Sequence, residues 1–208
     1  MKKIIFILFL TMSTFSFSQN DEAFVDALVA QKMAELEMQA NPEYFYRKEY
    51  CDGNSQAFTL RNGELCTSKN TYYAVYLFWR EDENLRFQKF DNCGRFSPFT
   101  ISASKQMARS LKEKEALKAE KIRPFASNKL NDATSENSAM QSCHKEYKFV
   151  FEGVTFEKSF KDIDLVEKSK KESKNANHNK SLALVKLEGE ISELVRNFET
   201  AGKFFREN

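Results

Sequence analysis

The run TYYAVYLFW, residues 71–79, constrains the fold of this chain more than any other stretch. Its apolar residues occupy both alternating positions, as in a strand that is covered on both faces of a sheet. The polar residues EDEN follow as a turn centred on residues 82–83, and LRFQKF returns as the partner strand. The cross-strand pairs expected in this hairpin are Phe78 with Phe87 and Val75 with Phe90. We therefore predict an antiparallel sheet with residues 71–79 near its centre.

Two other segments also have the pattern of β-hairpins. The dipeptide NG at residues 62–63 separates short β-prone runs, and this dipeptide is the strongest local hairpin signal. The predicted β region then covers residues 44–101. The dipeptide EG at residues 152–153 marks the turn of a second hairpin at residues 145–160, for which a single bulged strand is the alternative. The pairs expected there are Phe149 with Phe156 and Phe151 with Val154.

Three segments have the three- and four-residue apolar spacing of amphipathic helices. Residues 20–40 begin at a capping residue, Asn20 or Asp21, and end before a proline. Residues 102–123 are highly charged and have only a narrow apolar stripe. Residues 181–206 form the longest pattern, and we expect this helix to dock on its own β region. Pairing with the same helix of a second copy, which gives a homodimer, is the alternative.

The segments between these elements are polar. Residues 126–142, rich in Ser and Asn, predict a long loop. Residues 168–180, KSKKESKNANHNK, predict a solvated lysine-rich linker. The functional alternative for that linker is electrostatic binding to anionic lipid or polysaccharide.

Residues 1–18 have the layout of a secretory signal peptide. Lys2 and Lys3 form a positive start, a mostly apolar stretch follows, and small residues precede a cleavage site after Ser18. The apolar stretch is shorter than the roughly 20 residues that a membrane-spanning helix needs. We expect a periplasmic or secreted bacterial protein, with one mature domain at residues 19–208 and no further membrane span.

The export segment also accounts for the positive charge of the chain. Lys2 and Lys3 are two of its 32 Lys and Arg residues, so the mature part has 30 basic and 30 acidic residues. A net charge of zero gives no support for nucleic acid as a partner. The 190 mature residues, rich in Phe, suffice for one domain with a hydrophobic core.

Four cysteines follow the export segment, and an even number in an exported chain predicts disulfides. Three pairings of Cys51, Cys66, Cys93 and Cys143 exist. We favour Cys51–Cys66, which closes a loop around the NG hairpin, and Cys93–Cys143, which ties a bend to the next β segment.

The same cysteines are poor candidates for metal binding or catalysis. Their gaps of 15, 27 and 50 residues lack the close pairs of structural zinc sites. The two histidines are His144, beside another cysteine, and His178, in the predicted linker, so no base is expected near a thiol. In KFDNCGRF, Arg95 favours a thiolate at Cys93 while Asp91 opposes it, and a structural cystine explains every residue.

No nucleophile elbow, zinc-protease helix, phosphate loop or dinucleotide loop occurs in the sequence, so we name no catalytic, cofactor-binding or metal-binding residue. Two carboxylates at the right separation would suffice for a glycosidase. The acids of the β region include Glu43, Glu49, Asp52 and Glu64. Its aromatic residues suit core packing or a sugar-binding platform: Tyr44, Phe45, Tyr46, Tyr72, Tyr73, Tyr76 and Trp79.

EYCDGNSQAFTLRNGE, residues 49–64, resembles the opening of the small periplasmic C-type lysozyme inhibitors, which also begin with a cysteine strand and a hairpin. The resemblance implies a compact β-barrel. Ser102-Ala103-Ser104 is similar to the Ser-rich loop of that family but lacks its glycine. Because helices flank the β region here, we do not assign the chain to that family.

The sequence predicts an α+β fold: a small antiparallel sheet flanked by N-terminal, middle and C-terminal helices, with two disulfides. The function expected is non-catalytic binding of an unknown protein or polysaccharide partner. A cell-wall or polysaccharide hydrolase that uses unidentified carboxylates is the alternative.

Overall fold

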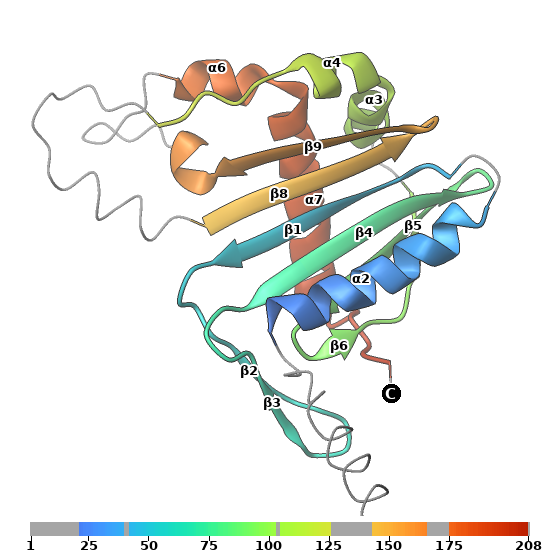
Figure 1. Cartoon of the computed structure of the whole chain (residues 1–208), viewed down its shortest axis with the longest axis vertical. Helices are drawn as coiled ribbons and strands as arrows, with labels where there is room; N and C mark the ends of the chain where they lie inside the picture. The colour runs from blue at the N-terminus through green and yellow to red at the C-terminus, as the bar shows by residue number, and fades with distance from the viewer. Residues whose placement is uncertain (1–20, 40–41, 103–104, 126–142, 166–174, 208) are drawn as a thin grey trace, which may run out of the picture.

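The computed structural model describes residues 21–39, 42–102, 105–125, 143–165 and 175–207 (Figure 1). A seven-stranded antiparallel sheet has the order β6-β5-β4-β1-β8-β9, with β7 also paired to β5, and a separate hairpin contains β2 and β3. The strands are β1 Tyr44–Cys51, β2 Ala57–Thr59, β3 Leu65–Thr67, β4 Tyr73–Glu81, β5 Asn84–Asp91, β6 Gly94–Arg95, β7 Phe99–Ile101, β8 Cys143–Phe151 and β9 Val154–Lys161. The helices are α2 Glu22–Glu37, α3 Lys105–Lys112, α4 Lys114–Ala119, the 3-10 helix η1 Asp162–Leu165, α6 Ala176–Ser181 and α7 Ala183–Thr200. The predicted α+β fold class is confirmed.

Of the three predicted hairpins, the one around residues 62–63 pairs β2 with β3, and the two for which cross-strand pairs were predicted have the expected register. β4 and β5 pair Phe78 with Phe87 and Val75 with Phe90, and β8 and β9 pair Phe149 with Phe156 and Phe151 with Val154. Residues 152–153 at the second turn both have positive φ, as in the two-residue turns that match the twist of paired strands. The alternative of a single bulged strand at residues 145–160 is therefore wrong.

The centre of the sheet contains β1 beside β4. β1 pairs antiparallel with β4 on one side and with β8 on the other. Its neighbour β8 belongs to a hairpin about a hundred residues further along the chain, so β1 joins the β4–β5 and β8–β9 hairpins into one sheet.

The two faces of the sheet are covered by different helices (Figure 1). α2 lies on one face, where its buried residues Val25, Val29 and Leu36 pack against Leu77 and Trp79. α7 crosses the opposite face. The core there includes Phe45, Phe78, Phe87, Phe149, Leu184, Leu187 and Ile191. α2 begins at Asp21, whose carboxylate accepts a hydrogen bond from the Phe24 N–H at 3.0 Å.

The predicted helix at residues 102–123 is instead two short helices, α3 and α4. The chain leaves the helical conformation at Glu120, whose carboxylate accepts from the Ala183 N–H at 2.8 Å and so caps the first turn of α7. Lys158 donates to the Lys118 and Glu120 carbonyl oxygens, each at 2.6 Å. The apolar stripe of a single helix could not signal these contacts with distant residues.

The predicted linker at residues 168–180 is wrong for its last part. Residues 168–174 lie outside the described residues, but α6 begins at Ala176, and Asn179 is fully buried. The Asn179 amide donates to the Arg123 and Asp164 carbonyl oxygens at 2.8 and 3.0 Å. The lysine-rich composition of the segment favoured a solvated linker and gave no indication that Asn179 is buried.

α7 is shorter than the predicted helix at residues 181–206, and it docks on its own sheet as expected. The chain turns at Gly202, which has a φ of +60°, and residues 203–207 then run beside β6. The Glu207 N–H donates to the Arg95 carbonyl oxygen at 2.9 Å.

Two further predictions, the export segment at residues 1–18 and the loop at residues 126–142, lie outside the described residues. Of the helices that the structure describes, none has the length and apolar character that crossing a membrane requires.

Candidate functional site

The four cysteines form two disulfides, but not in the predicted pairing. Cys51 is bonded to Cys143 and Cys66 to Cys93, so the prediction of Cys51–Cys66 and Cys93–Cys143 is wrong. Cys51 and Cys143 face each other across β1 and β8, with Cα atoms 4.1 Å apart. The prediction kept Cys51 beside the hairpin that follows it in sequence, whereas β1 pairs with a strand whose cysteine lies 92 positions away.

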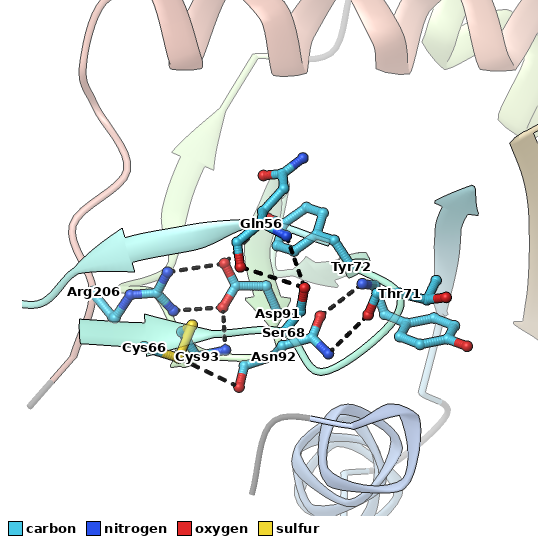
Figure 2. The surroundings of a disulfide bond; sticks show 10 residues. Gln56, Cys66, Ser68, Thr71, Tyr72, Asp91, Asn92, Cys93 and Arg206 are labelled. Atoms are coloured by element: carbon cyan, nitrogen blue, oxygen red, sulfur yellow. Dashed lines mark hydrogen bonds and ion pairs between the residues drawn. A yellow bond between two sulfur atoms is a disulfide. The ribbon is translucent and has the colours of Figure 1, made fainter. Parts of the chain in front are cut away.

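The bend KFDNCGRF is a structural corner (Figure 2). Asp91 is fully buried, and its carboxylate accepts two hydrogen bonds from the Arg206 guanidinium at 2.5 and 2.9 Å. It also accepts from the Tyr72 hydroxyl at 3.1 Å and from the Cys93 N–H at 2.8 Å. Since Asp91 is fully buried between Arg206, Tyr72 and Cys93, and Cys93 is bonded to Cys66, the corner anchors the C-terminal segment and the β2–β3 hairpin.

The α7 face of the sheet is divided into an aromatic half and a charged half. In the aromatic half, Phe45 lies between Phe78 and Phe149, with ring centroids 4.8 and 5.5 Å away. Two positions further along β1, Arg47 points to the same face, because side chains alternate along a strand. The neighbours of Arg47 across the sheet are Tyr76 and Tyr147. On β1, therefore, a charged residue follows Phe45 on this face, between two tyrosines of the neighbouring strands.

A charged cluster centred on the buried Arg47 occupies this second half; it contains Arg47, Glu49, Lys145, Tyr147, Glu188 and Ser192. The side chain of Arg47 is only 1% exposed. Its guanidinium donates to Glu188 at 3.0 Å and Ser192 at 3.0 Å on α7, and to Glu49 at 2.5 Å on β1. Because α7 supplies Glu188 and Ser192 one helical turn apart, the helix and the sheet jointly form this cluster.

The cluster contains a second cation. The Lys145 ammonium is 3.0 Å from the Glu49 carboxylate and 3.8 Å from that of Glu188. The Tyr147 hydroxyl, fully buried below α7, donates to Glu188. Each carboxylate of the charged cluster thus has at least two charged or hydroxyl partners, as buried charges require.

Lys89 on β5 forms a neighbouring ion pair. Its ammonium is 3.1 Å from the Glu199 carboxylate of α7. Three aromatic rings surround it, those of Phe204, Phe96 and Tyr76, with centroids 4.9, 5.4 and 5.6 Å from the nitrogen. Attraction between the cation and these rings holds the ammonium in place.

A pocket of about 400 Å³ opens beside these charges, and we call it the polar pocket. This volume lies within the roughly 300–1,000 Å³ of small-molecule sites. Three structural parts meet around it: the sheet, the connection from β1 to β2, and the last turns of α7. Its lining includes Glu49, Tyr76 and Lys89 from the sheet, Asn54, Gln56 and Phe58 from the connection and β2, Tyr72 before β4, and Val195 and Glu199 from α7.

The surroundings of the polar pocket keep Glu49 ionised. Burial alone would raise the pKa of Glu49, but the positive charges of Arg47 and Lys145 outweigh burial and hold its pKa below the ordinary value of 4.5. Burial, and then the charge of Glu49, raise the pKa of the Tyr76 phenol well above its ordinary value. At neutral pH the pocket therefore presents a carboxylate and a neutral phenol at these two positions.

The acids named from the sequence do not gather at one place. Glu49 lines the polar pocket. Glu43 pairs with Arg80 and Lys114, and Asp52 lies 3.3 Å from His144. The exposed Glu64 accepts from the Asn62 amide in its own turn. A pair of β-region carboxylates, as a glycosidase would need, is thus not formed by this set.

The named aromatic residues also separate. Tyr72 and Tyr76 line the polar pocket, while Phe45 lies in the aromatic half. Tyr44 and Trp79 are buried in the core below α2. All seven rings belong to one of the two hydrophobic cores or pack against it, which agrees with the core-packing interpretation.

Arg47, Lys89 and Glu199 were not predicted as site residues. A signal for two of them exists. Arg47 follows Phe45 by two positions and Lys89 follows Phe87 by two positions, so each charge occupies an inward position of a strand. No comparable signal marks Glu199, which lies on an exposed part of an amphipathic helix.

A second hollow, of about 510 Å³, lies between β8, β9 and the end of the segment after α4. Its buried acid, Asp164, accepts from the backbone N–H groups of Phe125 and Lys161 at 2.7 and 2.8 Å. These bonds connect η1 to the segment after α4 and to the end of β9, so Asp164 has a structural role. Within the described ranges, no three His, Cys, Asp or Glu side chains are grouped as a metal site requires.

Comparison with known proteins gives no relative: no family model, no curated protein and no solved structure matches the chain significantly.

Proposed function

We propose that the protein is an exported, non-catalytic binding protein that holds a small polar ligand, or one unit of a larger one, in the polar pocket. The observation that carries the proposal is the arrangement of Glu49, Lys89 and Glu199 around one cavity on rigid elements. Lys89 and Glu199 bond to each other at 3.1 Å, and Glu49 is held by Arg47. Groups fixed in this way can bind a ligand without large ordering costs.

The proposed location outside the cytoplasm has two supports. Residues 1–18 have the pattern of a signal peptide. Both disulfides join positions far apart in the chain, and such bonds persist in oxidising compartments. Periplasmic and fully secreted locations both satisfy these supports.

Binding is preferred over hydrolysis because of the ionisation of Glu49. A carboxylic acid that protonates a leaving group needs a raised pKa. The pKa of Glu49 is lowered, and its carboxylate is already paired with Arg47 and Lys145. This carboxylate is suited to accept hydrogen bonds from a ligand and unsuited to donate a proton to one.

The test is titration of the ¹⁵N-labelled protein with a panel of soluble oligosaccharides, dipeptides and amino acids. We expect at least one compound to shift the amide signals of Glu49, Gln56 and Lys89 and to be recovered unchanged after long incubation. Glu199→Gln should weaken that binding, whereas Glu193→Gln, the same change at an exposed position of α7, should not.

Two results would contradict the proposal. One is conversion of a panel compound into products, lost in Glu49→Gln or Glu199→Gln, which would establish the hydrolase alternative. The other is a panel in which no compound shifts the pocket signals.

A further inference from the structure

The polar pocket exposes both signs of charge side by side. The side chains of Glu49 and Glu199 are 34% and 50% exposed, and Lys89, whose side chain is 9% exposed, bonds to Glu199 through its ammonium. An anionic group placed there meets two carboxylates, and a cationic group meets Lys89 with Arg47 and Lys145 behind Glu49. A ligand with a net charge therefore meets repulsion from some part of the lining, whichever sign it carries.

Uncharged hydroxyl groups match the same lining. A hydroxyl donates one hydrogen bond and accepts others. It can donate to Glu49 or Glu199 and accept from the Lys89 ammonium, and hydrogen bonds to ionised groups are stronger than those between neutral groups. Several hydroxyls on one small ring could use these groups together.

Two amide side chains add further donors and acceptors. Asn54 and Gln56 line the pocket from the connection between β1 and β2. Figure 2 shows the Gln56 amide pointing away from the bonds around Asp91, while its backbone N–H is bonded to Ser68 at 2.9 Å. The backbone is thus held in place and the amide is left to contact a ligand.

The lining also contains apolar surface. The centroids of the Phe58 and Tyr72 rings are 5.5 Å apart. The Tyr72 hydroxyl donates a hydrogen bond to Asp91, which fixes its ring. Val195 contributes an aliphatic group from α7. A sugar ring has hydroxyls along its edge and C–H groups on its faces, so it matches a lining that combines charged acceptors with aromatic carbon.

From this lining we infer that the ligand is an uncharged carbohydrate, bound as one or a few units of a neutral glycan. The inference rests on the proposed function and names the ligand class of the same pocket. Glu49, Glu199 and Lys89 bind the hydroxyls, Gln56 and Asn54 add amide contacts, and Phe58 and Tyr72 contact the C–H face of the ring.

The experiment compares glycans that share a backbone and differ in charge. One pair is fully N-acetylated chitopentaose and its deacetylated, cationic form; another is pentagalacturonic acid and its fully methyl-esterified, neutral form. Binding is measured by calorimetry and by the amide signals of Gln56 and Lys89. We expect at least one neutral member to bind at the pocket and to bind at least about tenfold more tightly than its charged counterpart.

Two variants test whether the neutral glycan binds in the polar pocket. Glu199→Gln and Gln56→Ala each remove one contact from an exposed side chain, and each should weaken neutral-glycan binding about tenfold, the usual size for a hydrogen bond to a charged or buried group. Glu193→Gln is the matched control and should leave the affinity unchanged. Amide spectra without ligand verify that each variant is folded.

The inference is overturned if a charged glycan binds the pocket more tightly than its neutral counterpart, if only dipeptides or amino acids shift the pocket signals, or if no neutral glycan does. In the first two cases the pocket still binds a ligand, so the proposed function survives. Binding that is insensitive to both variants also overturns the inference, because the glycan then lies elsewhere.

Discussion

Single residues explain why the α7 face of the sheet is aromatic in one half and charged in the other. On β1 the positions after Phe45 on this face are filled by a fully buried arginine, Arg47, and its acidic partner Glu49. Buried ion pairs lose hydration, and apolar residues of similar size often stabilise a fold more. The charged cluster is therefore poorly explained by stability alone, and its effect here is to hold Glu49 ionised at the polar pocket.

Arg47→Met should lower the free energy of unfolding by about 3–5 kcal/mol, because Glu188 and Glu49 lose their main partner below α7. Urea unfolding measures the change. Lys48→Met is the control: Lys48 is the next residue on β1 and pairs on the opposite face with Glu22 and Asp26, both about half exposed. Such a partly exposed pair should contribute about 1 kcal/mol or less.

The double variant Arg47→Met/Glu188→Met sharpens this prediction. Since neither charge is then left without the other, it should lose at least about 1 kcal/mol less than the sum of the two single variants. Equal losses for Arg47→Met and Lys48→Met would mean that the charged cluster is not buried as described.

The lowered pKa of Glu49 predicts a pH dependence at the acidic side. A carboxyl group whose pKa is lower in the folded protein stabilises it fully above its unfolded value, here 4.5, and loses this effect as the pH falls toward the folded value. The stability difference between the wild type and Glu49→Gln should thus be constant near neutral pH and shrink below pH 4.5. A difference that persists unchanged at strongly acidic pH would contradict the assignment.

At the scale of elements, local sequence patterns predicted the hairpins, whereas the pairing of strands distant in sequence was not predicted. The turns at residues 82–83 and 152–153 and the alternation around them were enough to assign two registers correctly. The place of β1 was not predictable in this way, because its partner β8 is distant in sequence. The disulfide pairing failed for the same reason.

The polar pocket was less predictable than the fold. It combines β1, β5 and α7, and no local pattern indicates which helix turn covers which strand. Arg47 and Lys89 could have been noted as charges at inward strand positions. Glu199 becomes a site residue only through the path of α7 across the sheet.

Docking of α7 gives a prediction at this scale. Ile191 is fully buried between the helix and the sheet. Ile191→Ala should lower the free energy of unfolding by about 2–5 kcal/mol, because it removes buried groups and leaves a cavity. Glu193→Ala, exposed on the same helix, should change it by about 0.5 kcal/mol or less. Similar small losses for both would mean that α7 does not pack on the sheet.

For the whole molecule, two disulfides connect the parts that surround the polar pocket. Cys51–Cys143 joins the ends of β1 and β8, and Cys66–Cys93 ties the β2–β3 hairpin to the bend after β5. The connection that carries Asn54 and Gln56 lies between Cys51 and Cys66, so both of its ends are fixed to the main sheet. Chain entropy assigns about 4–5 kcal/mol to the first bond and about 3–4 kcal/mol to the second.

The central claim is that these two long-range bonds hold the pocket wall against the charged end of the sheet. Tryptic digestion of the unreduced protein, followed by mass spectrometry, tests it most directly, because basic residues separate all four cysteines onto different peptides. We predict linked peptides that contain Cys51 with Cys143 and Cys66 with Cys93. A peptide pair joining Cys51 to Cys66, or free thiols at any of the four positions, would contradict the account.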